Sequence, residues 1–593
     1  MTVSYPRPDG LHTKERTVLK ISEEKVWMKH FPAGVAELPL PQCTAYQYVK
    51  KNNSHRLDAP AIHYYGKDIT HRELQANIDA CANSLTALGV KQGDKVSFLT
   101  VALPETVCAL YAVNKLGATA NMIDPRMDIE SIRRAVKESG SHVLIAIDIA
   151  FPKVTPIMED IKQDYIIAQS AARSLPLVKK IAKTLMTKTN VPYSDQVISW
   201  KTFLSKGKGA SAAEAPYVGD AVFAITYTGG TTGFPKGVMI TNDGINAAAF
   251  NFKHAGLAVK EGERFLDIIP VFTSYGMCCG MHMPLAINLQ LVPIPKFDVN
   301  QFGKMVKDFR PQHMISTPAF YETLMNSKEL QDMDLSFLVT LGSGGDTMNE
   351  GLESKLTDFM KSHNIRYPLA QGYGMSELSA AASFCVNDIF KSKSVGIPSV
   401  TTSISIFDEE TGKELGYNQL GEICATGPSM MKGYYNRPEE TDHVMRLHED
   451  GKVWVHSGDL GYMDEDGFLF VIGRIKRMIT RFDGHKVFPV NIESLVASHE
   501  EVLNCSAIGV SDRERSQGHY PMVLVELSAT VADKEAFCKK LFEECNERLE
   551  ERGKPVAVLP VDAIPLTGSG KNDYRTLEKE YGQFDYLAWS AVS

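Results

Sequence analysis

A short segment near residue 230 combines the residue types that bind a polyphosphate. It reads Tyr227-Thr228-Gly229-Gly230-Thr231-Thr232-Gly233-Phe234-Pro235-Lys236-Gly237 and follows an apolar, β-prone run at 221–226. Glycines let a backbone approach a ligand closely, threonine hydroxyls donate hydrogen bonds, and the lysine adds positive charge. Pro235 before the lysine and Gly237 after it depart from the P-loop of kinases and GTPases. We therefore predict a phosphate loop of another class, with contacts from Thr228, Gly229, Gly230, Thr231, Thr232, Gly233 and Lys236.

This loop resembles the signature of the adenylate-forming superfamily, which includes acyl-CoA synthetases, peptide-synthetase adenylation domains and beetle luciferases. The resemblance covers residues 44–577, because further motifs follow in the family's order. They are Gln371-Gly372-Tyr373-Gly374-Met375-Ser376-Glu377, Gly421-Glu422-Ile423 with Gly433-Tyr434-Tyr435, His456-Ser457-Gly458-Asp459-Leu460, Gly473-Arg474-Ile475-Lys476 and Pro565-Leu566-Thr567-Gly568-Ser569-Gly570-Lys571. Six motifs in one order make a chance match negligible. The likeness is to the acyl-CoA synthetase branch of AMP-dependent ligases.

The resemblance implies an ATP-dependent acid–thiol ligase. A carboxylate is a poor electrophile, since its leaving group would be an oxide. Its attack on the α-phosphate of ATP gives an acyl-adenylate and pyrophosphate, and a thiol then takes the acyl group. Two anions must meet in the first step, so cations and oriented donors are required. We therefore expect ATP, Mg²⁺ and coenzyme A as the cofactors and co-substrates.

The resemblance also implies roles for single residues. The expected catalytic residues are Lys236, Glu377, Arg474 and Lys571. Glu377 would hold Mg²⁺, a hard cation that prefers oxygen ligands, and Lys571 would bridge the substrate carboxylate and the α-phosphate. Asp459 would accept the ribose hydroxyls, Arg474 would contact the ribose or a phosphate, and Tyr373 would stack on adenine. The remaining expected nucleotide contacts are Gly344, Gly345, Asp346, Gly372, Gly374 and Ser376.

The acid is expected to bind along residues 270–279. The predicted pocket residues are Phe272, Thr273, Tyr275, Met277 and Cys278. Thr273 stands where members that activate fatty or aryl acids often carry His, whereas amino-acid-activating members carry a nearby Asp for the α-ammonium. Residues 270–276 contain no Asp, and a buried unpaired cation is expensive. We therefore expect a fatty or aryl acid without an α-amine.

Two other interpretations stay open at this stage. The acceptor thiol could belong to a free-standing acyl carrier protein instead of coenzyme A. The chain could also be a non-catalytic nucleotide-binding relative, because Gly229 replaces a frequent serine and Thr273 replaces His. Asn491 also replaces a frequent Glu, and no effect is assigned to this departure. The presence of Lys571, Glu377, Asp459 and Arg474 weighs against that second alternative.

The elements around the motifs predict parallel sheets covered by helices. Thr70 and Glu73 form a capping-box pattern that opens a helix, whose apolar stripe runs to Leu88 before Gly89. A strand at 95–98 and a helix at 107–116 follow, and this alternation is typical of an α/β protein. We expect a large N-terminal adenylation domain, residues 1–474, of β-sheets layered with helices. A small mobile α+β domain, residues 475–593, would carry Lys571 and pivot at Lys476.

Within the small domain we expect a helix then strands over 489–527 and a long helix over 534–552.

Two stretches of the large domain look like interruptions. Residues 201–220, rich in Lys, Gly, Ser and Ala, predict an exposed loop. Residues 177–189 form a basic amphipathic pattern, for which a solvated helix face is favoured over contact with an anionic membrane surface.

Composition limits the classes of protein that remain. The 593 residues carry a formal net charge of −8, 44% of them are hydrophobic, and no apolar run is long enough to span a membrane. The charge argues against nucleic-acid binding. Ten irregularly spaced cysteines without a C-x-x-C pattern predict buried, reduced thiols. We expect a cytoplasmic enzyme, and leave a homodimer open.

Overall fold

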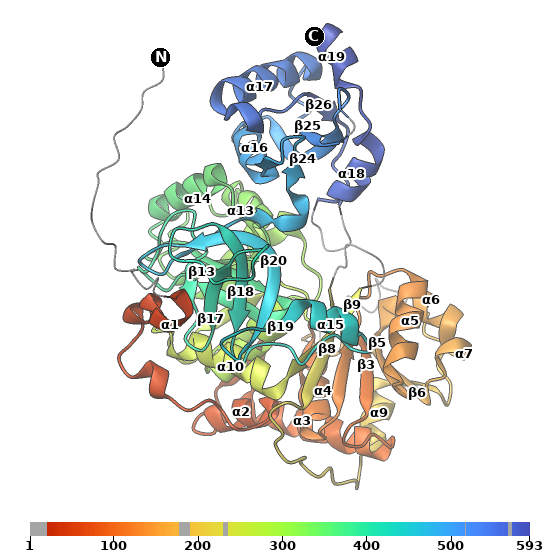
Figure 1. The fold of residues 1–593 in the computed structure, drawn as a ribbon. Coiled ribbons are helices and arrows are strands. Elements are labelled where there is room, and N and C mark those ends of the chain that lie inside the picture. The colour runs from red at the N-terminus through yellow and green to blue at the C-terminus, as the bar shows by residue number, and fades with distance from the viewer. Residues whose placement is uncertain (1–19, 177–189, 229–234, 516, 567–571, 593) are drawn as a thin grey trace.

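The computed structural model describes residues 20–176, 190–228, 235–515, 517–566 and 572–592. Within these residues, five sheets account for the strands (Figure 1). One sheet has seven strands in the order β7-β6-β5-β3-β4-β8-β9, parallel except for the antiparallel pair β8–β9. Its strands are β3 Lys95–Leu99, β4 Thr119–Met122, β5 Val143–Ile147, β6 Tyr165–Gln169, β7 Val197–Ser199, β8 Val222–Thr228 and β9 Lys236–Thr241.

The second large sheet has nine strands in the order β16-β15-β14-β13-β12-β10-β11-β1-β2 among the described residues. Its centre is parallel, while β2, β15 and β16 pair antiparallel at the two edges. Its strands are β1 Pro60–Tyr64, β2 Lys67–Thr70, β10 Arg264–Asp267, β11 Gln290–Pro293, β12 His313–Ser316, β13 Thr340–Ser343, β14 Ala370–Met375, β15 Ala380–Phe384 and β16 Ile397–Pro398.

Helices from distant parts of the chain pack between these two sheets. One continuous apolar core joins Phe98 of the first sheet, Leu110 and Ala248 of helices, and Leu266 of the second sheet. The described α-helices of this part are α1 Ile21–Glu24, α2 Ala45–Asn52, α3 His71–Ala87, α4 Pro104–Lys115, α5 Ile129–Ser139, α6 Phe151–Val154, α7 Met158–Ile161, α9 Trp200–Lys206, α10 Asn242–His254, α11 Met283–Ala286, α12 Phe302–Phe309, α13 Pro318–Met325, α14 Glu350–Ser362 and α15 Pro438–Val444.

An antiparallel sheet completes the large part of the molecule and leads to the C-terminal part. Its strands are β17 Ser403–Phe407, β18 Gly421–Thr426, β19 Met445–Leu447, β20 Val453–Met463 and β21 Leu469–Arg474. The chain beyond β21 forms the unit coloured blue at the top of Figure 1. It approaches α14, because a Cβ at Gly351 would lie 3.8 Å from Ser498 Cα. It contains β22 Ile479–Thr480, β23 Lys486–Val487, α16 Pro489–Val496, β24 Val502–Ser511, β25 His519–Leu527, α17 Lys534–Arg548, β26 Val558–Val561, α18 Tyr574–Tyr581 and α19 Tyr586–Val592.

The C-terminal unit has apolar clusters of its own, built from residues after 478. The predicted α/β class, with a large part and a smaller α+β part, is confirmed. The helix and strands expected over 489–527 are present, and the helix expected over 534–552 ends earlier, at Arg548. The boundary at residue 475 and the mobility of the smaller part stay predictions.

Local signals explain which predicted elements form. Thr70 and Glu73 make the full capping box of α3: the Thr70 hydroxyl accepts from Glu73 N and the Glu73 carboxylate accepts from Thr70 N. The loop predicted over 201–220 is wrong at its start, because α9 occupies Trp200–Lys206 and buries Phe203. Ser199 caps that helix by accepting from Thr202 N. The amphipathic stretch 177–189 lies outside the described residues.

The cysteines behave as expected. All ten are free thiols in the described residues; nine are buried, and Cys43 is partly exposed. Within the same residues, every helix falls short of the length and apolar character that crossing a membrane requires.

Candidate functional site

An ion pair between two neighbouring strands anchors the site. Asp459 on β20 and Arg474 on β21 are direct cross-strand partners. Arg474 Nε donates to Asp459 Oδ1 at 2.8 Å, and the Tyr373 hydroxyl of β14 donates to Asp459 Oδ2 at 2.7 Å. The Asp459 side chain is 7% exposed and that of Arg474 is 52% exposed. The sequence-predicted residues Tyr373, Asp459 and Arg474 therefore come together from three strands.

The turn before Asp459 is held by several hydrogen bonds. The Ser457 hydroxyl donates to Ile423 O at 2.6 Å and accepts from Asp459 N at 3.0 Å, while Ser457 O accepts from Arg474 Nη1 at 3.0 Å. Gly458 adopts a φ of +68°, which favours glycine. The side chains at 459 and 474 are thus oriented before any ligand arrives.

Burial raises the pKa of Tyr373 well above its ordinary value, and the negative charge of Asp459 raises it further. The phenol therefore stays protonated and donates to the carboxylate. The face of its ring is an apolar surface of the kind that stacks on a nucleobase, and stacking on adenine stays a prediction.

A second set of side chains gathers around Glu377, which is 7% exposed. The Tyr434 hydroxyl donates to Glu377 Oε1 at 2.6 Å, and Lys236 Nζ lies 4.7 Å from the centre of the Tyr434 ring. The backbone explains this meeting: Met431 N donates to Glu377 O at 2.8 Å, and residues 433–435 hydrogen-bond to β9. Tyr434 belongs to a recognised motif, but its link to Glu377 was not predicted.

Glycines bring the loops of the site close together. A Cβ at Gly374 would lie 1.5 Å from Ala380 O, so a side chain would force β14 and β15 apart. A Cβ at Gly344 would lie 3.3 Å from Gly372 O, which shows how near these two predicted nucleotide loops run. Asp346 is exposed and accepts from Thr347 N at 2.9 Å. Contacts from Gly345 and Asp346 to a nucleotide stay predictions.

The predicted acid-binding segment forms an uncommon π-helix, Tyr275–His282. π-helical turns are rare and occur often at functional sites. Phe272, Met277 and Cys278 are buried, and burial raises the pKa of the Cys278 thiol well above its ordinary value, so the thiol is neutral. Thr273 caps this helix: its hydroxyl donates to Pro270 O at 2.8 Å and accepts from Gly276 N at 3.1 Å. Tyr275 packs against the Gly344–Gly345 backbone.

Two buried polar groups, one at the end of β10 and one at the last residue of the π-helix, have no signal in the sequence. Asp267, at the end of β10, is 1% exposed, and burial raises its pKa to about 8. Its Oδ1 accepts from Ile269 N at 3.2 Å, whereas its Oδ2 has no hydrogen-bond partner in the described part of the chain. His282 Nδ1 bonds to the Tyr111 hydroxyl at 3.1 Å, but His282 Nε2 has no such partner there either. Nothing in the periodicity of 264–282 signals these groups.

One hydrogen bond joins the predicted acid segment to the predicted nucleotide segment. The Ser274 hydroxyl donates to Ser376 Oγ at 2.7 Å. Ser274 immediately precedes the π-helix, and Ser376 immediately precedes Glu377. The two predicted halves of the site are therefore in direct contact.

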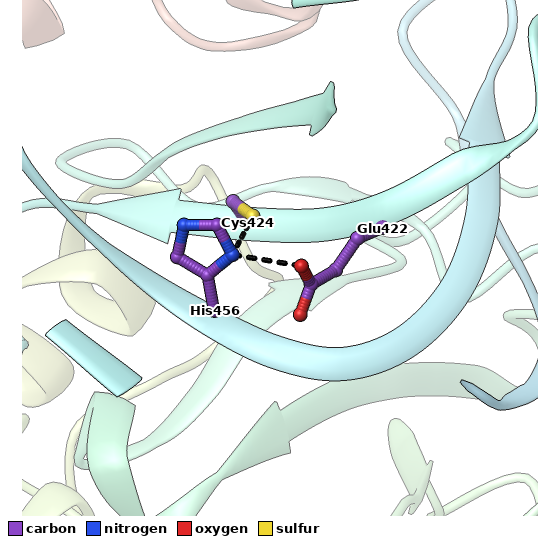
Figure 2. Close-up of side chains that lie close together, drawn as sticks. All are labelled: Glu422, Cys424 and His456. Carbon is purple, nitrogen blue, oxygen red and sulfur yellow. Dashed lines mark hydrogen bonds and ion pairs between the residues drawn. The ribbon is translucent and has the colours of Figure 1, made fainter. Parts of the chain in front are cut away.

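Glu422, Cys424 and His456 form a further buried cluster, which Figure 2 shows. It adjoins the Asp459 turn, because Gly458 N donates to Glu422. Glu422 Oε2 lies 2.7 Å from His456 Nδ1, and Glu422 Oε1 accepts from Gly458 N at 2.9 Å. Cys424 Sγ lies 3.5 Å from the same His456 nitrogen. Glu422 and His456 belong to two of the recognised sequence motifs, and neither was predicted to have a role in the site.

The other predicted residues divide into two groups. Thr228 ends β8, where its hydroxyl donates to Lys236 O at 3.5 Å, and Lys476 is exposed in the turn after Arg474. Gly229, Gly230, Thr231, Thr232, Gly233 and Lys571 lie outside the described residues. Their convergence on one triphosphate stays a prediction.

The chain matches two families in sequence. Residues 49–435 match the AMP-binding enzyme family, and residues 491–571 match the AMP-binding enzyme C-terminal domain. The chain is 30% identical over 570 residues to a long-chain-fatty-acid–CoA ligase of Bacillus subtilis, covering 94% of this chain and 99% of that protein. It is 26% identical over 524 residues to a probable 4-coumarate–CoA ligase of Dictyostelium discoideum, covering 87% and 92%.

Solved structures share the fold. The anthranilate CoA ligase AuaEII in complex with anthranoyl-AMP superposes with a TM-score of 0.78 at 20% identity, covering 94% of this chain and 99% of that one. ATP-bound MatB from Rhodopseudomonas palustris gives a TM-score of 0.76 at 21% identity, covering 91% and 99%.

Proposed function

The chain belongs to the AMP-binding enzyme family, and we propose that it is an ATP-dependent ligase that converts a carboxylic acid to its coenzyme A thioester. The acid would first attack the α-phosphate of ATP, forming an acyl-adenylate and releasing pyrophosphate. The thiol of coenzyme A would then attack the acyl carbon, and AMP would leave. The acid is a fatty or aryl acid without an α-amine.

The observation that carries this proposal is the paired cluster of Tyr373, Asp459 and Arg474. It offers a buried carboxylate beside an aromatic ring and a half-exposed guanidinium. A carboxylate is suited to accept both hydroxyls of a ribose, and a guanidinium to contact a phosphate. Three such groups from three strands form one end of a nucleotide site.

The triphosphate would lie toward Lys236 and Glu377. Lys236, with the threonine and glycine residues at 228–233, would bind the β- and γ-phosphates through charge and hydroxyl donors. The Glu377 carboxylate fits a hard cation because it offers oxygen atoms in a buried position. Bound there, Mg²⁺ would neutralise phosphate charge. The Tyr434 hydroxyl orients this carboxylate at 2.6 Å.

Lys571 would bridge the substrate carboxylate and the α-phosphate during adenylation. Its position near the end of the smaller domain suits a group that enters the site for one half-reaction and leaves it for the other. Lys476, two residues after Arg474, is the proposed pivot. The smaller domain, from residue 475, would change orientation between the two half-reactions.

The acid class rests on the environment of the π-helix and on the names of relatives. Met277 and Cys278 are apolar and buried, which favours an aliphatic or aromatic group. The Asp267 carboxyl group lies against Gly280 of the π-helix, and burial raises its pKa to about 8, so it is mainly neutral at pH 7. It therefore offers no fixed negative charge to an α-ammonium. A fatty acid is the first candidate, because the Bacillus subtilis relative is named a long-chain-fatty-acid–CoA ligase.

The test is acid-dependent exchange of pyrophosphate into ATP, across short, medium, long and aromatic acids with α-amino acids as the matched control. Exchange with fatty or aryl acids alone is expected. Exchange with no carboxylic acid would favour a non-catalytic relative, and efficient exchange with an amino acid would contradict the assigned acid class. Thioester assays with coenzyme A and with an acyl carrier protein then identify the acceptor.

Replacement of Lys571 tests the two half-reactions separately. Lys571→Ala is expected to lower adenylation at least roughly 100-fold and to spare thioester formation from supplied acyl-adenylate. Equal loss of both half-reactions would contradict a lysine that serves only the first.

A further inference from the structure

The side chains of Glu422, Cys424 and His456 form a buried cluster that the proposed ligase reaction does not use. Glu422 and Cys424 lie two residues apart on β18, so both point to one face of the sheet. His456 on β20 is the direct cross-strand partner of Cys424. Figure 2 shows the three side chains pointing toward one another. Their ligand atoms all lie within 4.8 Å of each other.

We propose that Glu422, Cys424 and His456 bind a divalent transition metal of the zinc class. Thiolate, imidazole and carboxylate are the ligand types that Zn²⁺ takes in proteins. With ordinary bond lengths, a tetrahedral Zn²⁺ holds a sulfur and a nitrogen ligand about 3.5 Å apart. Cys424 Sγ and His456 Nδ1 are 3.5 Å apart. Both atoms therefore stand at the spacing that such an ion requires.

The carboxylate must move relative to both other ligands. Its oxygen lies within 4.8 Å of Cys424 Sγ, whereas sulfur and oxygen ligands of one tetrahedral Zn²⁺ lie about 3.5 Å apart. Glu422 Oε2 lies 2.7 Å from His456 Nδ1, the distance of a hydrogen bond. Nitrogen and oxygen ligands of one tetrahedral Zn²⁺ lie about 3.3 Å apart. A rotation of the long glutamate side chain supplies this difference of about 0.6 Å. The metal then replaces the hydrogen bond between the two groups.

Coordination also fixes where the protons go. The Cys424 thiol must release its proton to solvent, and His456 Nδ1 must bind through its lone pair, so the ring proton lies on Nε2. His456 Nε2 is 2.8 Å from His448 Nε2, which can accept that proton's hydrogen bond. Ligating histidines commonly have such a partner on the other ring nitrogen.

The surroundings suit a bound cation in charge as well as in geometry. The Gly458 N–H already holds the other Glu422 oxygen, at 2.9 Å. The anionic forms of Glu422 and Cys424 together balance a divalent ion. The ion would join β18 to β20 one residue before Ser457, and so stiffen the Asp459 turn.

The test uses the full-length protein and Co²⁺, a probe that takes the geometry of Zn²⁺. After dialysis we expect about one Co²⁺ per chain and a thiolate-to-cobalt charge-transfer band in the near ultraviolet. Cys424→Ala should lose the band. Cys108→Ala, which removes another buried cysteine on α4, should keep it. Absence of the band in the unmodified protein, or its survival in Cys424→Ala, overturns the proposal.

Two further measurements separate the metal site from a simple packing role. Added Zn²⁺ should raise the thermal midpoint of the unmodified protein and of Cys108→Ala, but not that of Cys424→Ala; equal shifts in all three would contradict the site. His448→Gln should keep the cobalt band while weakening metal affinity about 10-fold or more. Unchanged affinity would contradict the role of His448. None of these readouts depends on ligase activity.

Discussion

The side of the site proposed for the nucleotide and the side proposed for the acid differ in how their buried polar groups are bonded. On the nucleotide side, Asp459 has both oxygens bonded, to Arg474 and to Tyr373. On the acid side, Asp267 and His282 are buried, and each leaves a polar atom without a hydrogen-bond partner among the described residues. Unpaired buried polar atoms cost free energy. The polar groups around Asp459 are therefore fixed by the fold itself. The unpaired atoms of Asp267 and His282 instead lower the stability of their surroundings.

The largest effect is expected at Asp267, on the acid side. Burial raises its pKa from 3.8 to about 8, so the folded protein binds a proton that the unfolded chain releases above about pH 4. Stability is therefore lost as pH rises from about 4 to about 8. Asp267→Asn should be more stable than the unmodified protein at pH 7, by at most roughly 4 kcal/mol.

Thermal midpoints of the two proteins between pH 5 and pH 8 give the measurement. The advantage of Asp267→Asn should widen with pH and level off near pH 8. The matched control is Asp466→Asn, since the Asp466 side chain is 60% exposed and pairs with Lys29. Parallel curves for Asp267→Asn and the unmodified protein would remove the contrast between the two sides.

The next effect is expected at Asp459, on the nucleotide side. Asp459→Asn removes the charge that faces Arg474 and one of the two acceptors proposed for the ribose. We expect acid-dependent pyrophosphate exchange to fall roughly 100-fold, with the main change in the Michaelis constant for ATP. The fold should persist, because the Arg474 side chain is 52% exposed and water can solvate it. Unchanged kinetics would show that the ribose assignment is wrong, and Asp466→Asn is again the control.

A smaller effect is expected at Tyr434. Tyr434→Phe removes only the hydroxyl that donates to Glu377, and hydrogen bonds to charged groups contribute roughly 1.5–3 kcal/mol. We expect activity to fall about tenfold and the Mg²⁺ concentration needed for half-maximal rate to change. Tyr435→Phe is the matched control, because Lys95 contacts the Tyr435 ring and phenylalanine keeps that ring. Equal effects of both substitutions would argue against a specific link to Glu377.

The smallest effect is expected at Thr273, at the start of the π-helix. Thr273→Val removes the hydroxyl that bonds to Pro270 O and Gly276 N, at a cost of about 1 kcal/mol, typical of a helix cap. A lower thermal midpoint would show this loss, while Thr273→Ser should stay close to the unmodified protein. If the valine substitution instead changes acid selectivity and leaves stability alone, Thr273 contacts the substrate.

The contrast between the two sides also explains what the sequence could predict. Asp459 and Arg474 stand in recognised motifs, and a single antiparallel pairing of β20 with β21 places them opposite each other. Thr70 and Glu73 are three residues apart, so their capping box is readable from the chain alone. Such short-range patterns carry most of the fold class and the motif positions.

The features that the sequence did not predict depend on contacts between distant segments. Asp267 and His282 lie in a mainly apolar stretch, where no local pattern marks them as special. Only the packing of the π-helix against β10 shows that Asp267 Oδ2 and His282 Nε2 have no hydrogen-bond partner among the described residues. Tyr434 meets Glu377 because residues 433–435 bond to β9, a pairing that no local pattern specifies. The composition of 201–220, rich in Lys, Gly, Ser and Ala, likewise predicted a loop where α9 forms. The burial of Phe203 in that helix depends on contacts with distant segments.

The bond between the Ser274 and Ser376 hydroxyls has a consequence for substrate choice. Ser274 precedes the segment expected to cradle the acid, and Ser376 precedes the carboxylate expected to hold Mg²⁺. An acid that fits the pocket poorly and displaces Ser274 would also displace Ser376 through this hydrogen bond. Under the proposed function, a change at the acid could therefore alter the position of Glu377 without any atom of the acid touching Glu377.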